Sequence, residues 1–226
     1  MKNLIYIFTF IITTTVIAQN TALLDIKKQQ LKQALAYGDD AVAAANMYAI
    51  INIEGPQSTY KDSLAYLYFN ARNYSSCFLV TNDILKNNSN NLELLEMQAI
   101  SLESLGVYGK AAEVYETLLM KTNNNYHAYK LAGLQLALNR FEAANTTIKK
   151  ADQLPDEGKV EVTFQVNKNY NENVNLKAAI AYVEGIIALN LKKNAEAKLS
   201  FERAIKLFPD FVLAKGKLEA LNTTKE

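Results

Sequence analysis

The sequence is poor in the residues that carry most side-chain chemistry. Its 226 residues include one Cys, one His and no Trp. An internal disulfide needs two thiols and a structural zinc site needs about four Cys or His ligands, so both are excluded. Basic residues number 24 and acidic residues 23, and a chain without a basic excess has no overall field to hold a polyphosphate. Nucleic acid is therefore not expected as a partner.

Glycine and proline are also scarce. Only 8 Gly and 3 Pro accompany a hydrophobic fraction of 50% and a charged fraction of 21%. These hydrophobic and charged fractions are those of a folded globular chain. Because turn-forming residues are few and Ala, Leu and Tyr are abundant, the composition indicates a mostly helical protein.

The first residues have the order of a secretory signal peptide. Lys2 supplies a positive charge, an apolar run begins at Leu4, and small residues end at Ala18. The apolar stretch is about 15 residues long, shorter than the roughly 20 that a membrane-spanning helix needs. We therefore predict a signal peptide over 1–18 and an exported mature chain over 19–226 with no transmembrane anchor. The periplasm is the expected location, with secretion or surface association as alternatives.

A small residue recurs at a nearly constant interval along the mature chain. It opens the second helix of a predicted helix-turn-helix pair, and its separations are 33, 34, 33 and 53 residues. The series is Ala44, Cys77, Ala111, Ala144 and Ala197. A period of about 34 is the length of a helix-turn-helix repeat, whose two helices bury their apolar faces only by stacking on neighbouring repeats.

On these residues the chain resembles the tetratricopeptide repeats, a family whose pattern includes Ala-x3-Phe in the second helix and a closing Pro. The last repeat is the most similar, although no repeat has the family's Trp, Thr81 replaces the aromatic residue of the second repeat, and Lys32 stands in the first where the others have a small residue. Residues expected to pack within the repeats are Ala44, Cys77, Ala111, Ala144, Gly185, Ala197, Phe201, Ala204 and Pro209. The resemblance implies an all-α fold, a right-handed α-solenoid of about five repeats with a C-terminal capping helix. Asp210, directly after Pro209, is expected to cap the N-terminus of that last helix. The repeats fall near residues 25–58, 58–91, 92–125, 125–158 and 178–211, and the capping helix at about 211–222.

One interval exceeds the period by about 19 residues, which places an insertion at about 155–175. Residues 159–166 alternate polar and apolar side chains and are predicted as a strand or extended segment, followed by an Asn-rich loop over 167–175. Two interpretations stay open. The insertion either lays its apolar side on the neighbouring helices, or folds over or beside the binding groove and contacts a partner or offers it a strand edge.

The sequence offers no catalytic constellation. Cys77 occupies the small-residue position of its repeat, so a buried packing thiol is favoured over a nucleophile. His127 has no second His or thiol nearby and is interpreted as a surface residue. We predict no catalytic, cofactor-binding or metal-binding site, and a protein that is not an enzyme.

The resemblance implies recognition by a concave face that the first helix of each repeat lines. Carried onto this sequence, the groove comprises Tyr66, Phe69, Asn70, Glu96, Ile100, Glu103, Tyr126, Tyr129, Tyr182 and Ile186. Tyrosine offers a large rigid surface with a hydrogen-bonding end, although several of these side chains could instead pack between helices. The predicted function is a protein–protein interaction module that binds a peptide segment or helix of an envelope protein. The alternative is a structural spacer or self-associating subunit of a larger envelope assembly, and the sequence leaves the oligomeric state open.

Overall fold

The computed structural model describes residues 2–156 and 158–223, with the side chains of the first helix from Gln19 onward. The predicted signal peptide, residues 1–18, lies outside the described side chains and stays a prediction. Among the described residues, no helix is both long enough and apolar enough to cross a membrane.

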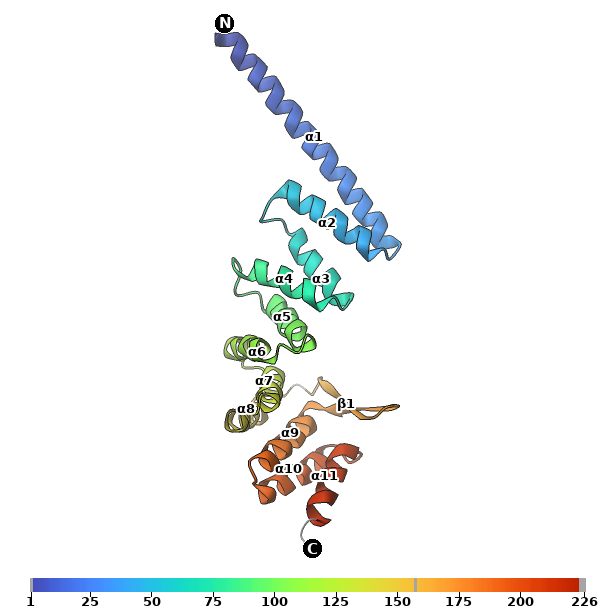
Figure 1. Ribbon diagram of the computed structural model, residues 1–226, viewed down its shortest axis with the longest axis vertical. Helices are drawn as coiled ribbons and strands as arrows, with labels where there is room; N and C mark the ends of the chain where they lie inside the picture. The colour runs from blue at the N-terminus through green and yellow to red at the C-terminus, as the bar shows by residue number, and fades with distance from the viewer. Residues whose placement is uncertain (1, 157, 224–226) are drawn as a thin grey trace. The chain divides into compact units, whose positions relative to one another are not determined.

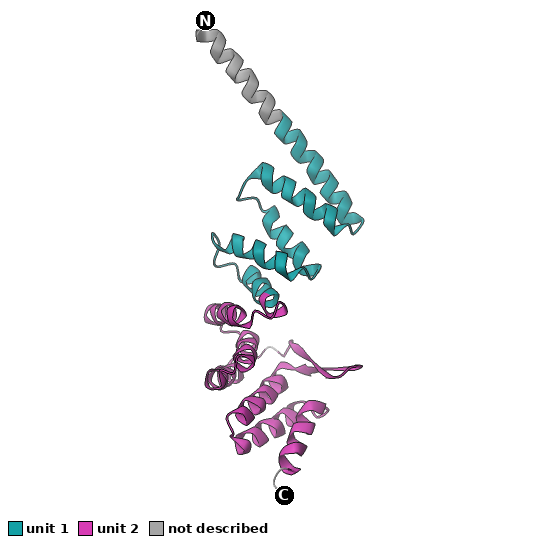
Figure 2. Ribbon diagram, viewed as in Figure 1, with its two compact units in different colours: residues 1–101 teal, residues 102–226 magenta. Residues whose placement is uncertain are grey.

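The chain is built from paired helices and one β-hairpin (Figure 1), and it divides into two compact units (Figure 2). Unit 1 is residues 1–101 and unit 2 is residues 102–226. Unit 1 holds α1 (Lys2–Ala36), α2 (Asp40–Glu54), α3 (Tyr60–Asn70), α4 (Tyr74–Leu85) and most of α5 (Leu92–Ser104). Unit 2 holds the end of α5, then α6 (Tyr108–Thr122), α7 (Asn125–Ala137), α8 (Phe141–Gln153), β1 (Glu161–Asn167), β2 (Tyr170–Asn175), α9 (Leu176–Asn190), α10 (Asn194–Leu207) and α11 (Val212–Thr223).

The two helices of each pair are joined by the same tight turn. One residue of each turn is left-handed, with φ between 55° and 73°: Gly38, Arg72, Gly106, Asn139 and Lys192. The residue after it donates its N–H to the carbonyl five positions back at 2.8–2.9 Å, which satisfies a carbonyl that the helix end leaves free. The separations of the left-handed residues are 34, 34, 33 and 53. The backbone therefore repeats with the period of the small-residue series, although only two of the five turns carry Gly.

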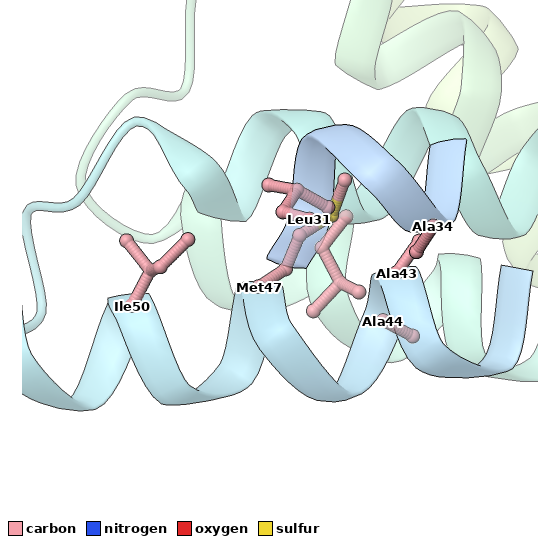
Figure 3. Close-up of a cluster of buried hydrophobic side chains, with 7 residues drawn as sticks. Leu31, Ala34, Ala43, Ala44, Met47 and Ile50 are labelled. Atoms are coloured by element: carbon pink, nitrogen blue, oxygen red, sulfur yellow. The ribbon is translucent and has the colours of Figure 1, made fainter. Parts of the chain in front are cut away.

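The turn corrects the alignment of the first repeat. Counting 34 residues back from Cys77 reaches Ala43, which is fully buried, whereas Ala44 beside it is 8% exposed. The same count aligns Leu31, not Lys32, with the buried Ala65 of α3. Lys32 is exposed, so it does not interrupt the series of small and apolar residues at the helix contacts. The first helix pair thus has its own apolar core, in which Leu31 and Ala34 of α1 face Ala43, Met47 and Ile50 of α2 (Figure 3).

The other small residues lie where the paired helices meet. Cys77, Ala111, Ala144, Ala197 and Ala204 are fully buried, while Pro209 is exposed beyond the end of α10.

Gly185 shows why small residues are needed at these contacts. A Cβ atom added to it would lie 2.5 Å from the ring of Phe201, which is itself fully buried. Close packing leaves no room for such an atom, so α9 and α10 approach each other only because this side chain is absent.

The insertion between α8 and α9 is a two-stranded antiparallel β-hairpin in which Val162 pairs with Val174 and Phe164 with Glu172. The predicted extended segment corresponds to β1. The prediction of a loop over 167–175 is wrong, because most of this Asn-rich stretch forms β2. Pairing with β1 outweighs the low strand propensity of asparagine.

The β-hairpin packs on the last helix pair and on α11. The ring centroid of Phe164 lies 5.4 Å from that of Tyr182 and 5.2 Å from that of Phe211. The buried Glu172 carboxylate accepts the Val212 N–H at 3.1 Å, where it complements the positive end of the helix dipole. Glu172 therefore caps α11, and not Asp210 as expected from its place in the sequence.

Candidate functional site

In unit 1, the predicted groove residues lie on α3 and α5. Tyr66 of α3 is half-buried, and its hydroxyl donates a hydrogen bond to the Glu93 carboxylate of α5. That hydrogen bond, together with burial and the charges of Glu93 and Asp62, raises the pKa of Tyr66 to about 12. Glu96 and Ile100 are half-buried and follow Glu93 at three and seven residues, a spacing that puts all three on one side of a helix.

Phe69 and Asn70 lie at the end of α3. Phe69 packs edge-on against Tyr74 with ring centroids 6.2 Å apart and an interplanar angle of 72°. It therefore supports the start of α4 as well as the α3 surface. Asn70 is exposed.

In unit 2, the predicted groove residues lie on α7 and at the end of α5. Tyr126 and Tyr129 stack with ring centroids 6.4 Å apart. The Lys130 Nζ atom lies 2.6 Å from Glu103 Oε1, so this carboxylate is paired. Burial raises the pKa of Tyr129 well above its ordinary value, with further contributions from Tyr126, Glu103 and Tyr182. The two tyrosines and the ion pair thus form one continuous patch.

A cavity of about 260 Å³ opens beside Tyr129 within unit 2. Gly133 keeps part of it open, since a Cβ atom there would meet no heavy atom within 4 Å. The lining residues are Glu103, Tyr108, Tyr129, Lys130, Gly133, Leu134 and Ala137. Aromatic walls with one ion pair suit the side chain of a peptide ligand.

Tyr182 is not available as a groove residue, and its prediction is corrected. Its side chain is 8% exposed, because the rings of Phe164, Phe201 and Phe211 lie 5.4, 5.8 and 5.0 Å away. The β-hairpin supplies the covering Phe164 ring. Ile186, one turn further along α9, is half-buried.

A spacing of 27 residues links successive first helices in both units. It joins Tyr66 to Glu93 (93 − 66 = 27) and Glu103 to Lys130. The value equals the period of about 34 less about two helical turns. The predicted groove omits Glu93 and Lys130, and a search for hydrogen-bonding pairs at this spacing is the signal that would find them.

His127 and Cys77 are both buried. The prediction of a surface histidine is wrong: His127, at the start of α7, is 8% exposed, and its Nδ1 atom lies 2.9 Å from Oγ1 of Thr122, the last residue of α6. The position faces α6, a contact that the local sequence does not reveal. Burial raises the pKa of the Cys77 thiol, which disfavours the thiolate needed for nucleophilic attack. Across the described ranges, no three His, Cys, Asp or Glu side chains gather as a metal site.

Comparisons with known proteins place the fold. No family model and no curated protein sequence matches the chain, but solved structures do. The chain is similar to YrrB, described as a TPR protein with an unusual peptide-binding site, with a TM-score of 0.66 and 14% identity over 84% of this chain and 88% of that one. It is similar to MamA from Desulfovibrio magneticus RS-1, with a TM-score of 0.62 and 14% identity over 84% of this chain and 97% of that one.

A further MamA structure has a TM-score of 0.60 and 16% identity over 74% of this chain and 81% of that one. The fold is therefore an all-α solenoid of helix-turn-helix repeats. More particularly, it is the fold of tetratricopeptide-repeat proteins.

Proposed function

We propose that this protein is an exported, non-catalytic interaction module that holds an extended peptide segment or a helix of an envelope protein on the first helices of its repeats. The observation that carries the proposal is the pair of aromatic surfaces on those helices, Tyr66 in unit 1 and Tyr126 with Tyr129 in unit 2. The peptide-binding site named for YrrB supports a peptide as the ligand class.

These tyrosines have the properties of interface anchors. Each is half-buried, so its ring is held in place while part of it stays accessible. Neighbouring side chains fix the rings further: Glu93 accepts the Tyr66 hydroxyl, and Tyr126 stacks on Tyr129. A pre-ordered aromatic side chain loses little conformational entropy on binding, which is why such residues dominate interface energies.

The test compares first-helix tyrosines with exposed apolar residues on second helices. Peptides are selected from a displayed random library against the purified wild-type protein, and one labelled peptide is titrated by fluorescence anisotropy. Tyr66→Ala combined with Tyr129→Ala should weaken binding about 30-fold or more while helical circular dichroism is kept. Leu79→Ala with Met120→Ala is the matched control, since these side chains are 62% and 69% exposed on α4 and α6. Equal weakening of peptide binding by both variants would contradict the proposal.

Export is supported by the order of residues 1–18 and is tested separately. Cell fractionation followed by N-terminal sequencing should find the protein outside the cytoplasm with Gln19 as its first residue. Retention of Met1 in a cytoplasmic protein would contradict this part of the proposal.

Self-association is a second candidate function, favoured by apolar side chains left exposed on the first helix pair. These are Leu23, Ile26, Leu35 and Val42, at 44%, 51%, 49% and 45% exposure. A self-associating subunit should run as a dimer or larger species in chromatography with light scattering, and Ile26→Lys with Val42→Lys should return it to a monomer. A wild-type protein that stays monomeric at all concentrations would exclude this function.

A further inference from the structure

The cavity beside Tyr129 contains an ion pair with unused hydrogen-bonding capacity. Glu103 and Lys130 both line this cavity, and their side chains are 30% and 21% exposed. The bond between them joins Lys130 Nζ to Glu103 Oε1. Among the described residues, Glu103 Oε2 accepts no hydrogen bond and Lys130 Nζ donates no other. Because an ammonium group has several donors and a carboxylate has two acceptor oxygens, the pair still offers a ligand one acceptor and one donor.

The side chains around the cavity are fixed by contacts within unit 2. Lys130 Nζ lies 5.9 Å from the ring centroid of Tyr115, which is fully buried. Tyr129 stacks on Tyr126 with ring centroids 6.4 Å apart. Side chains that are already ordered lose little further freedom when a ligand binds. The cavity is therefore a pre-ordered site.

The size and walls of the cavity suit one aromatic side chain. Its volume is about 260 Å³, below the roughly 300–1,000 Å³ of sites that hold a drug-sized molecule. Tyr108 of α6 and Tyr129 of α7 line it. Leu134 and Ala137 add apolar surface from α7. Pairs of aromatic rings attract each other beyond the effect of apolar burial, so these walls favour an aromatic ligand side chain over an aliphatic one.

The charges of the cavity decide which aromatic side chain fits. Glu103 and Lys130 cancel, and the other lining residues are uncharged. A cationic side chain would meet the Lys130 ammonium and an anionic one the Glu103 carboxylate, so neither gains a net attraction. Phenylalanine would displace water from both charged groups and return no hydrogen bond, which costs binding energy. Tryptophan only donates, and histidine has a smaller and more polar ring, whereas the tyrosine hydroxyl both donates and accepts.

We propose that this cavity binds a tyrosine side chain of the peptide ligand, with the phenol hydroxyl donating to Glu103 and accepting from Lys130. The inference rests on the proposed function and specifies the residue that anchors the ligand. The ligand ring lies against Tyr108 and Tyr129, which puts the peptide on the α7 surface that Tyr126 shares. Peptides selected against the protein should therefore have a tyrosine in common.

The hydroxyl contact is tested by changing the peptide and the protein together. The probe is the labelled peptide selected from the display library, made with its tyrosine and with phenylalanine in that place. The phenylalanine peptide should bind the wild-type protein about tenfold or more weakly, because hydrogen bonds to charged groups are lost. In the double variant Glu103→Met with Lys130→Met, which leaves neither charge unpaired, the two peptides should bind within about threefold of each other.

A second ion pair provides the matched control. Lys61 Nζ lies 2.6 Å from Asp83 Oδ2 in unit 1, the same distance as in the cavity, and the Lys61 side chain is also 21% exposed. Lys61→Met with Asp83→Met should leave the preference for the tyrosine peptide at about tenfold or more. Thermal unfolding checks that both double variants are folded. Loss of the preference in both variants, or in neither, would overturn the inference.

Filling the cavity gives a second readout that leaves the ion pair in place. Gly133→Leu adds a side chain to the cavity lining, whereas Gly216→Leu adds the same side chain to α11, outside that lining. A Cβ atom at either glycine would meet no heavy atom within 4 Å. Gly133→Leu should weaken binding of the tyrosine peptide about tenfold or more, and Gly216→Leu should change it less than about twofold. Equal effects of the two substitutions would contradict binding in the cavity.

The outcome of the peptide selection separates this inference from the proposed function. Selected peptides that lack a tyrosine, or that bind equally well with phenylalanine in its place, overturn the inference. If Tyr66→Ala with Tyr129→Ala still weakens those peptides, the proposed function stands. If no peptide binds, the proposed function fails and the inference fails with it.

Discussion

Tyr129 and Tyr182 occupy the same position in successive repeats, yet their surroundings differ. They are 53 residues apart, the separation of Ala144 and Ala197. Tyr129 is half-buried beside an open cavity, whereas Tyr182 is 8% exposed beneath Phe164 of the β-hairpin. Position within the repeat thus determines the direction of a side chain, but an insertion elsewhere in the chain determines whether a partner can reach it.

Removing the Phe164 ring should abolish the difference between Tyr182 and Tyr129, and it has the largest expected effect on stability. Phe164→Ala loses the ring contacts with Tyr182 and Phe211, and we expect it to destabilise the protein by about 3 kcal/mol, measured by urea unfolding. Tyr182 should then become as reactive toward tetranitromethane as Tyr129, as followed by peptide mass mapping.

The control for that experiment is Val166→Ala, a smaller truncation on the same strand. It should destabilise by about 1 kcal/mol and leave Tyr182 unreactive. If Tyr182 of the wild-type protein reacts as fast as Tyr129, the β-hairpin does not cover it.

The helix contacts beneath the two tyrosines provide a second contrast. Gly185→Ala should destabilise by about 2 kcal/mol, since its Cβ atom would lie 2.5 Å from the buried Phe201 ring. Gly133→Ala on α7 meets nothing within 4 Å and should stabilise by about 0.7 kcal/mol through its better helix propensity. Thermal unfolding measures both, and a loss of stability in both variants would argue against the tight α9–α10 contact.

Much of the fold could be predicted from sequence because small residues recur at the helix contacts with the period of the repeat. Cys77, Ala111 and Ala144 mark the helix contacts locally, and a helix pair has few alternatives for burying them. Sequence places the first repeat one residue too far along because Ala43 and Ala44 are both small. The structure corrects this placement through the turn, where Gly38 adopts the left-handed conformation.

The turns themselves allow a sharper comparison between repeats. Gly106 and Lys192 hold equivalent left-handed positions, at φ 73° and 61°. A side chain costs roughly 1 kcal/mol in this conformation, so Gly106→Ala should destabilise and Lys192→Gly should stabilise by about that amount. Chemical denaturation of the two variants measures the changes, and effects of the same sign would contradict a shared turn geometry.

The site was harder to predict than the fold, because its accessibility depends on contacts between distant segments. Nothing near Tyr182 in the sequence indicates that Phe164 covers it. Likewise, Glu172 caps α11 from 40 residues away, and the strand around it has the Asn-rich composition of a loop. Alternation in residues 159–166 indicated an extended segment, but its partner strand and its packing partners carried no local signal.

The smallest expected effect concerns unit 1. Tyr66→Phe keeps the ring and loses the hydrogen bond to Glu93, and we expect it to destabilise by roughly 0.5 kcal/mol at neutral pH, since the pair is partly solvated. The pKa of Tyr66 is raised to about 12 in the folded protein. The stabilisation that this hydrogen bond gives the folded protein is therefore fully present below the unfolded pKa of about 10 and is lost as pH rises toward 12. The free energies of unfolding of wild type and variant, measured in urea, should converge over that range. A difference that grows with pH would contradict the assignment.

Fluorine NMR of the protein labelled with 3-fluorotyrosine tests most directly whether a peptide binds at the first-helix tyrosines that the β-hairpin leaves open. Resonances are assigned by single Tyr→Phe changes, and the library-selected peptide is added. We predict that the Tyr126 and Tyr129 resonances shift most, with Tyr182 shifting less and Tyr48 on the second helix α2 unchanged. A peptide that shifts Tyr48 while leaving Tyr126 and Tyr129 in place would contradict the account.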